Sequence, residues 1–304
     1  MAFLNFLKKD FSKRWQLYLM LLLPVSHAVI FKYIPMYGIT LAFKDFSLRD
    51  TMFGGAWVGV KYFRQFLGAP MFWSLLKNTF AITFYSLLAG FPLPIIFALA
   101  LNEMRSRRVV KTMQTITYAP YFISTVVMVG IILQVLHMRV GMVNNLLDLL
   151  GFERIDFMGK VGYFRHIYVW SGVWQSMGFS AVIYIAALAG VDPGLVEASV
   201  IDGASRLRKI WHVFLPSIQP TILIQLIFAI GGLMSLGFDK IWLMQNSVVL
   251  PVSEVISTFV YKRGLEQRQY SYATAVDLFN AAVNFALLAV ANFSSRKIGG
   301  ASLW

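Results

Sequence analysis

The residue types that most often do chemistry in enzymes are few in this sequence and stand far apart. The four histidines, His27, His137, His166 and His212, form neither an H-E-x-x-H run nor a cluster with metal-ligand spacing. Cysteine is absent, which excludes disulfides, thiolate metal sites and cysteine nucleophiles. The sequence also lacks a G-x-x-x-x-G-K-[ST] loop that could hold nucleotide phosphates. We therefore expect no catalytic residue, no metal site and no cofactor on this chain.

A polar face within one apolar segment could instead bind a polar ligand. Gly172, Gln175, Ser176 and Phe179 fall at positions i, i+3, i+4 and i+7, on one side of a helix. Together they offer bare backbone, an amide, a hydroxyl and a ring, which suit the hydroxyl groups and C–H faces of a sugar. Small and polar residues also hold transmembrane helices together, so spacing alone leaves both interpretations open. Weaker candidates lie on a later apolar segment, at Gln225 and Ser235.

A loop at 191–217 is rich in residues that begin and end helices. Asp192 is a good N-cap, and Gly203 is placed to end the helix in a left-handed turn. Ser205 can then cap a second short helix, from Arg206 to about Val213. The pattern predicts a helix–turn–helix elbow with an acidic first arm and a basic second arm. On these residues alone, a solvated connector is an equally good interpretation.

The elements that must position these residues are membrane spans. Of the 304 residues, 58% are hydrophobic and only 13% are charged, whereas a soluble domain has roughly 25% charged residues. A spanning helix needs about 20 mainly apolar residues, and six segments provide them: 16–37, 72–101, 113–136, 167–190, 220–238 and 273–293. Pro92 and Pro94 predict a kink in the second. The fold class predicted is an all-α polytopic membrane protein with six transmembrane helices in a single transmembrane domain, residues 1–304.

The distribution of Lys and Arg predicts the orientation of the spans. These residues are denser in 1–15, 102–112, 191–217 and 295–304 than in the alternate loops 38–70, 138–166 and 239–273. Cytoplasmic loops carry the excess of positive charge, so both termini and the elbow are predicted to be cytoplasmic. The net charge of +13 is then explained by topology, and no nucleic-acid partner is expected because a nucleic-acid reader clusters its basic residues on a soluble face.

The elbow residues also resemble a known pattern. Glu197-Ala-Ser, followed by Gly203-Ala and then Leu215-Pro216, is similar to the EAA loop of ATP-binding-cassette (ABC) importer permeases. Ser199 stands where the pattern has its second Ala. Because serine is also small, it permits the same close approach of a docking partner. The resemblance implies a type I ABC importer permease fold with a cytoplasmic coupling helix that docks on an ATPase. The coupling residues that it implies are Glu197, Ala198, Ser199, Asp202, Gly203, Ala204, Leu215 and Pro216.

The resemblance extends over roughly residues 76–304 and indicates a substrate class. Segments 141–151 and 170–188 are similar to carbohydrate-type permeases, in which the span before the coupling loop lines the pathway. This implies a pathway role for the face that begins at Gly172. The tail, residues 237–304, resembles a narrower group associated with complex or uronic-acid-containing oligosaccharides. Other sugars or small polar nutrients are the alternative substrates.

The resemblance also implies the partners and the location. The expected partners are a second homologous permease subunit, two ABC ATPase subunits that carry ATP and Mg, an extracytoplasmic solute-binding protein, an oligosaccharide substrate and membrane lipid. The location implied is the bacterial cytoplasmic (inner) membrane, with multiple spans. Loop 239–273 carries a slight surplus of positive charge, with Lys240, Lys262, Arg263 and Arg268 against Asp239, Glu254 and Glu266. Such charges most often form a docking surface, here for the binding protein, and the alternative is that the surplus suits acidic glycans.

Two other classes of membrane protein fit this sequence less well than an importer subunit does. A secondary, ion-coupled transporter needs ionisable groups in mid-membrane, yet the third, fourth and fifth predicted spans contain no charged residue and no His. A membrane-embedded enzyme would need an acidic pair or a metal-spaced cluster within a span. The secondary transporter is the closer alternative. On the last span, Asn280 and Asn284 are expected to make hydrogen bonds between helices.

Overall fold

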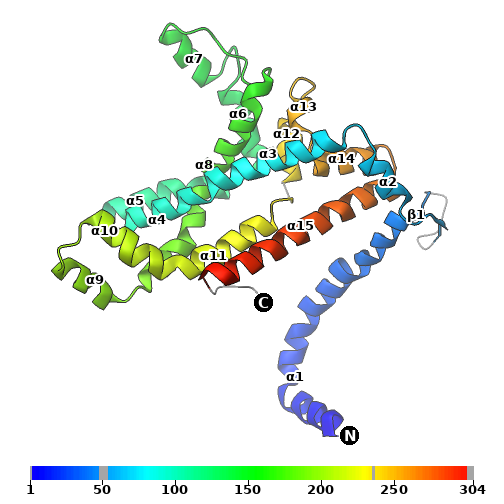
Figure 1. Ribbon diagram of the computed structural model, residues 1–304, viewed down its shortest axis with the longest axis horizontal. Helices are drawn as coiled ribbons and strands as arrows, with labels where there is room; N and C mark the ends of the chain where they lie inside the picture. Colours follow the sequence, from blue (N-terminus) through cyan, green and yellow to red (C-terminus); the bar gives the residue numbers. More distant parts are fainter. Residues whose placement is uncertain (1, 48–53, 235–236, 300–304) are drawn as a thin grey trace. The chain divides into compact units, whose positions relative to one another are not determined.

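A computed structural model describes residues 2–47, 54–234 and 237–299, and the side chains of 13–47, 54–234 and 237–297. The regular secondary structure of the described chain is helical apart from one two-stranded antiparallel sheet, β1 (Lys44–Asp45) and β2 (Ala56–Trp57). The α-helices (Figure 1) are α1 (Ala2–Ala28), α2 (Lys61–Leu67), α3 (Phe72–Gly90), α4 (Pro92–Asn102), α5 (Arg107–Tyr118), α6 (Thr125–Val135), α7 (Met142–Leu149), α8 (Val161–Ala189), α9 (Pro193–Ile201), α10 (Arg206–Lys209), α11 (Leu215–Gly231), α12 (Phe238–Met244), α13 (Leu250–Ser253), α14 (Ile256–Tyr261) and α15 (Tyr270–Gly299). Short 3-10 or π segments complete them: η1 (Val29–Tyr33), η2 (Ile34–Phe43), η3 (Ala119–Phe122), η4 (Ile210–Phe214) and η5 (Lys262–Glu266).

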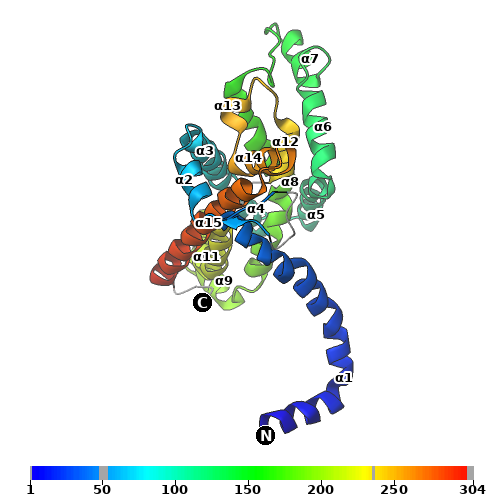
Figure 2. The same cartoon turned by 90° about the vertical axis from the view of Figure 1, so that its right-hand side faces the viewer.

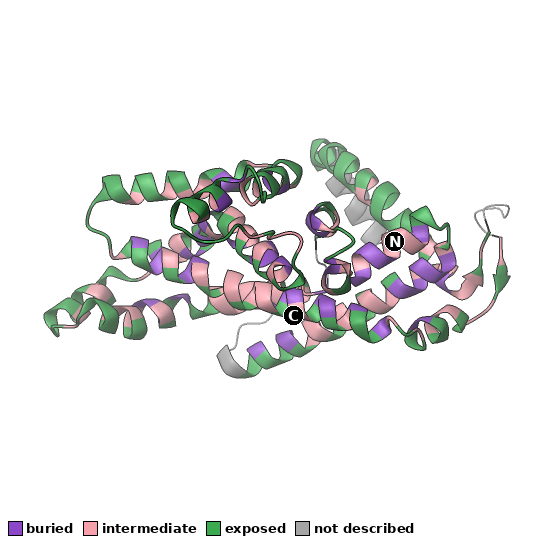
Figure 3. Cartoon of the chain, turned by 90° about the horizontal axis from the view of Figure 1, so that it is seen from above, coloured by how far each residue is buried: buried purple, intermediate pink, exposed green. Residues whose placement is uncertain are grey.

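Within the described residues, five helices are long and apolar enough to cross a membrane, and a bent pair makes a sixth. The five are Lys13–Phe43, Phe72–Asn102, Val161–Ala189, Arg206–Gly231 and Tyr270–Lys297. Buried residues form only short stripes along these helices, and much of their surface is exposed (Figure 3). Such apolar exposed faces are expected of helices whose solvent is lipid, and the prediction of a polytopic all-α protein is confirmed.

The third predicted span is bent, which the prediction of one helix over 113–136 did not include. Arg107–Phe122 and Thr125–Val135 meet at 102°. Pro120 lies just before the break, and Ile123 takes an extended conformation. Ser124 then caps α6 by accepting a hydrogen bond from the Val127 N–H at 3.4 Å. A proline that cannot continue the backbone ladder and a new N-cap four residues later explain the turn.

The fifth span also differs from its predicted bounds of 220–238. Its helix begins at Arg206, because α10, η4 and α11 follow one another without a break. The π turn makes this possible: the Leu215 N–H bonds the Ile210 carbonyl five residues back, which accommodates the missing N–H of Pro216. The helix ends at Gly231, where Gly232 caps it. The second arm of the elbow is therefore the start of the span itself.

The described chain divides into two compact units, and the prediction of a single domain stays a prediction. The first comprises the chain up to Gly68 and Lys262–Leu278. In it, Asp45 binds the Tyr62 hydroxyl at 2.6 Å and the Lys61 ammonium at 3.0 Å, and these hydrogen bonds hold the pKa of Asp45 below its usual value. Helix α1 is kinked at Arg14, visible in dark blue in Figure 2.

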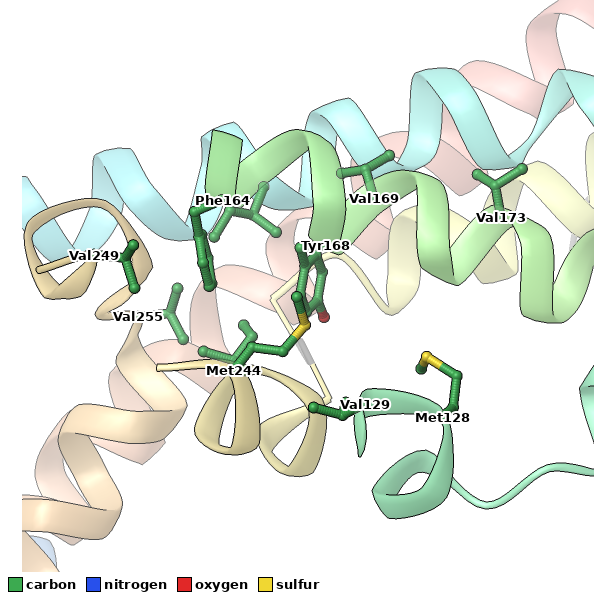
Figure 4. Packing of buried hydrophobic residues seen from close by; sticks show 11 residues of the cluster. Met128, Val129, Phe164, Tyr168, Val169, Val173, Met244, Val249 and Val255 are labelled. Carbon is green, nitrogen blue, oxygen red and sulfur yellow. The ribbon is translucent and has the colours of Figure 1, made fainter. Parts of the chain in front are cut away.

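The second unit, Ala69–Tyr261 with the chain from Phe279 onward, contains two apolar clusters. Figure 4 shows the first, in which Phe164 and Tyr168 of α8 belong to one cluster with Met244 of α12 and Met128 of α6. The second joins α4, α8, η4 and α11 around Tyr184. Helix α8 contributes to both clusters and is the central element of the unit.

Candidate functional site: a membrane cavity and an elbow

A cavity of about 1210 Å³ lies within the second unit. Helices α3, α4, α8, α11 and α12 all contribute to its walls. Of the six predicted pathway residues, five line it: Gly172, Gln175, Ser176, Phe179 and Gln225. The sixth, Ser235, lies outside the described residues. The predicted polar face and the weaker candidate on α11 therefore meet at one cavity, although contact with substrate stays a prediction.

The polar groups of this face are partly engaged within the protein. Gln175 donates from Nε2 to the Ile123 carbonyl at 2.9 Å, which ties α8 to the bend of the third span. Ser176 donates to the Gly172 carbonyl one turn back. The ring of Phe179 stacks on Tyr121, with centroids 3.9 Å apart and planes at 8°. The face thus holds the bend in place and presents a flat aromatic surface beside it.

A lysine that sequence reasoning assigned to an outer docking surface lines the same cavity. Lys240 of α12 is only 9% exposed. Its Nζ donates to the Tyr168 carbonyl at 2.6 Å and lies 4.5 Å from the centroid of the Tyr168 ring. Burial lowers the pKa of Lys240 to about 8, so the amine is still mainly cationic at neutral pH. In α12, Lys240 directly follows Asp239 and precedes four apolar residues, so the sequence gives only a weak signal that its side chain is buried.

The elbow has the capping geometry that its residues predict. Asp192 Oδ1 accepts from the Gly194 N–H at 2.8 Å, and Ser205 Oγ accepts from the Arg208 N–H at 3.4 Å. Gly203 has φ +70°, and the Ala204 N–H bonds the Ser199 carbonyl at 2.9 Å. This is the left-handed helix end expected of glycine. The described elbow is therefore two capped arms, α9 and α10, joined by one tight turn.

One side of the elbow packs inward and the other is exposed. Val196 lies against the apolar cluster around Tyr184. On the outside, apolar side chains remain uncovered within the described chain, with Ile201 85% exposed. The other exposed apolar side chains of the elbow are Leu195, Val200, Leu207 and Trp211. The predicted coupling residues Glu197, Ala198, Asp202 and Gly203 are exposed as well. Ser199, Ala204 and Leu215 are half-buried, and Pro216 is exposed at the start of α11.

An ion pair that the sequence did not reveal joins the elbow to the second span. Lys209 Nζ lies 3.0 Å from Oε1 and 3.2 Å from Oε2 of Glu103, the residue that caps α4. The two side chains are 13% and 16% exposed for Glu103 and Lys209 respectively. Because 106 residues separate them in sequence, no local pattern could indicate the contact.

The asparagines of the last span make the predicted hydrogen bonds. Asn280 donates to the Met234 carbonyl at 3.1 Å, and Asn284 donates to the Gly231 carbonyl at 2.5 Å. Asn284 also accepts from the Met234 N–H at 3.2 Å. The bond of Asn284 to Gly231 joins α15 to the last residue of α11, as predicted, whereas Met234, which bonds both asparagines, lies three residues beyond that helix.

The fold and the site together define a class of protein. The family described as "Binding-protein-dependent transport system inner membrane component" matches residues 90–299. That range contains the cavity-lining face of α8, the elbow and the last span. The chain belongs to this family, and it is a multi-pass permease subunit of an ABC importer.

Particular relatives match almost the whole chain. The polygalacturonan/rhamnogalacturonan transport system permease protein YteP of Bacillus subtilis (strain 168) is 41% identical over 283 residues, 93% of this chain and 88% of that protein. Protein LplB of the same organism is 39% identical over 291 residues, covering 96% and 90%. A chain in the crystal structure of a bacterial ABC transporter involved in the import of the acidic polysaccharide alginate is 37% identical, with a TM-score of 0.89 and coverage of 96% and 99%.

Proposed function

We propose that this permease forms one half of the pathway of an oligosaccharide importer whose ATP is hydrolysed on separate subunits. The observation that carries the proposal is the pairing of a cavity with a capped, exposed elbow in one unit of the chain. The cavity has hydrogen-bonding groups and a flat aromatic surface. The elbow has apolar side chains that a partner would cover. Such a subunit needs a cavity for the solute and a docking surface for the ATPase.

The elbow is the proposed ATPase-docking element, and its side of the membrane is the proposed cytoplasmic side. Both termini would then be cytoplasmic, in agreement with the Lys and Arg distribution. Glu197, on the exposed first arm, would contact the ATPase. Closure of two ATP- and Mg-loaded ATPase subunits would draw the elbows of two permeases together. Movement of each elbow would pass to the cavity through the helix that starts at Arg206.

The remaining partners follow from the family and from the named relatives. A binding-protein-dependent system requires a solute-binding protein on the outer side, and one relative was solved with an alginate pentasaccharide-bound periplasmic protein. Six spans form half a pathway, so a second, homologous permease is proposed as well, with lipid around both. The substrates after which two of these relatives are named, polygalacturonan/rhamnogalacturonan and alginate, include acidic polysaccharides. We therefore place oligosaccharides that contain uronic acids foremost among the substrates.

The proposal is tested by co-purification of the tagged chain from native membranes, followed by mass spectrometry and an ATPase assay. We expect a second permease, an ATPase and hydrolysis stimulated by oligosaccharide with binding protein. Glu197→Lys should reduce recovery of the ATPase by at least tenfold, since it reverses a charge at the interface. Glu153→Lys, the same change on an exposed residue outside the elbow, is the matched control. Solute uptake driven by an ion gradient in a chain without an ATPase would overturn the proposal.

A further inference from the structure

The ammonium of Lys240 is a buried cation without an acidic partner among the described residues. There, ion pairs join Lys61 to Asp45, Arg154 to Asp148 and Lys209 to Glu103, and none includes Lys240. Its one hydrogen bond goes to a neutral backbone carbonyl, at Tyr168. An ammonium has three N–H donors, so two stay available. Burial of an unpaired charge is costly unless something compensates it.

The space beside this ammonium belongs to the cavity. Gly172 lies next to it, and a Cβ built on that glycine would be 3.0 Å from Lys240 Nζ. Because glycine has no side chain, the ammonium can lie close against the backbone of α8 at the cavity wall. Gln175 and Ser176 follow on the same face of α8, and both line the cavity. A ligand in the cavity can therefore reach the cation and hydrogen-bonding groups at the same time.

We propose that Lys240 is the specificity-determining residue for anionic sugars in the pathway, where its ammonium binds the carboxylate of a uronic acid residue. The proposal deepens the oligosaccharide function above and rests on it. A carboxylate supplies the counter-charge that Lys240 lacks, and its oxygens accept hydrogen bonds from the two free N–H groups. A neutral sugar would supply only hydroxyl groups. The face of Tyr168 and its carbonyl keep the cation in place when the cavity is empty.

The test uses two probes with the same sugar backbone: trigalacturonate, whose carboxylates are charged, and its fully methyl-esterified form, whose esters are neutral. Uptake is measured in cells that express the complete transporter with its own binding protein, and the result is the ratio of acid to ester uptake. Since the binding protein is unchanged, a change in this ratio reports the permease. Lys240→Met should lower the ratio roughly tenfold or more, the loss expected for one charged hydrogen bond. Lys240→Arg should keep most of it.

The matched control is Lys160→Met, which removes one lysine from an exposed position outside the cavity. It should leave the ratio unchanged. An equal fall in uptake of both probes in Lys240→Met would make Lys240 a packing residue and overturn the proposal. Uptake of both probes at the wild-type rate in that variant would overturn it as well.

A second measurement separates this proposal from the proposed function. The thermal midpoint of the purified complex is measured with millimolar trigalacturonate or its ester, because a ligand that binds the folded state raises the midpoint. We expect a larger shift with the acid in wild type and equal shifts in Lys240→Met. If wild type imports neither probe but shows this pattern, the carboxylate site stands and oligosaccharide import falls. Equal shifts in wild type would overturn the carboxylate site whatever the import result.

Discussion

The ion pair between Glu103 and Lys209 connects the elbow to the end of the second span, and its removal should weaken both stability and coupling. Lys209→Met leaves the Glu103 carboxylate, 13% exposed, without its partner at 3.0 Å. Breaking a buried pair on one side costs about 3–5 kcal/mol. Since both groups keep some contact with solvent, we expect about 3 kcal/mol. That corresponds to a fall of about 5–10 °C in the thermal midpoint of the purified complex.

The assay combines a double-mutant cycle with a coupling ratio. Lys209→Met, Glu103→Gln and the double variant are compared for thermal midpoint and for ATP hydrolysed per oligosaccharide imported. Each single variant should raise the ratio, because the elbow can move without the second span. The double variant leaves no uncompensated charge, so it should be less damaging than the sum of the two single changes. Additivity within about 0.5 kcal/mol would refute the reasoning.

The exposed pair Lys61–Asp45 is the matched control for the size of the effect. Its side chains are 53% and 50% exposed, and exposed pairs typically contribute under about 1 kcal/mol. Lys61→Met should therefore leave both the midpoint and the coupling ratio close to those of wild type. An effect as large as that of Lys209→Met would mean that loss of any lysine in the chain, and not the position of Lys209, is responsible.

Three further changes test the elbow and the helix contacts. Gly203→Val forces a β-branched residue to φ +70°, at a cost of about 1–2 kcal/mol, and should lower ATPase recovery in the pull-down while the spans stay folded. Gly178→Ala places a Cβ against the Thr117 carbonyl and should lower the thermal midpoint; Gly162→Ala on the same helix, with open space around it, should not. Asn284→Leu removes two bonds to the end of α11 and should cost about 1 kcal/mol, seen as a midpoint a few degrees lower; no change would mean that water satisfies that helix end.

The elbow could be predicted from the sequence because its structure is set by residues close together in the chain. Asp192 bonds a backbone N–H two residues on, and Gly203 ends the helix through its own backbone conformation. The spans could be located because their apolar composition is set by the lipid that surrounds them. The polar face of α8 was found by helical spacing, and all of its members line one cavity.

The features that were missed depend on contacts between distant residues. Lys240 and Tyr168 are 72 residues apart, so only the packed structure shows that a lysine predicted for the surface lines the cavity. Glu103 and Lys209 are joined in the same way. The bend after Pro120 is different: its local signals, a proline and the Ser124 cap, are present in the sequence, but continuous apolar composition outweighed them. Apolarity indicates that a segment enters the membrane and says little about its direction there.

The uninterrupted helix from Arg206 to Gly231 has a mechanical consequence. Its 26 residues are about 39 Å long. Ile218, fully buried in the cluster around Tyr184, holds it near the middle, about 18 Å from one end and about 20 Å from the other. If the helix tilts as a rigid rod about that point, its two ends move by nearly equal amounts in opposite directions. A displacement of the elbow by a few ångströms then displaces the Gly231 end, beside the cavity, by the same few ångströms, without amplification or loss.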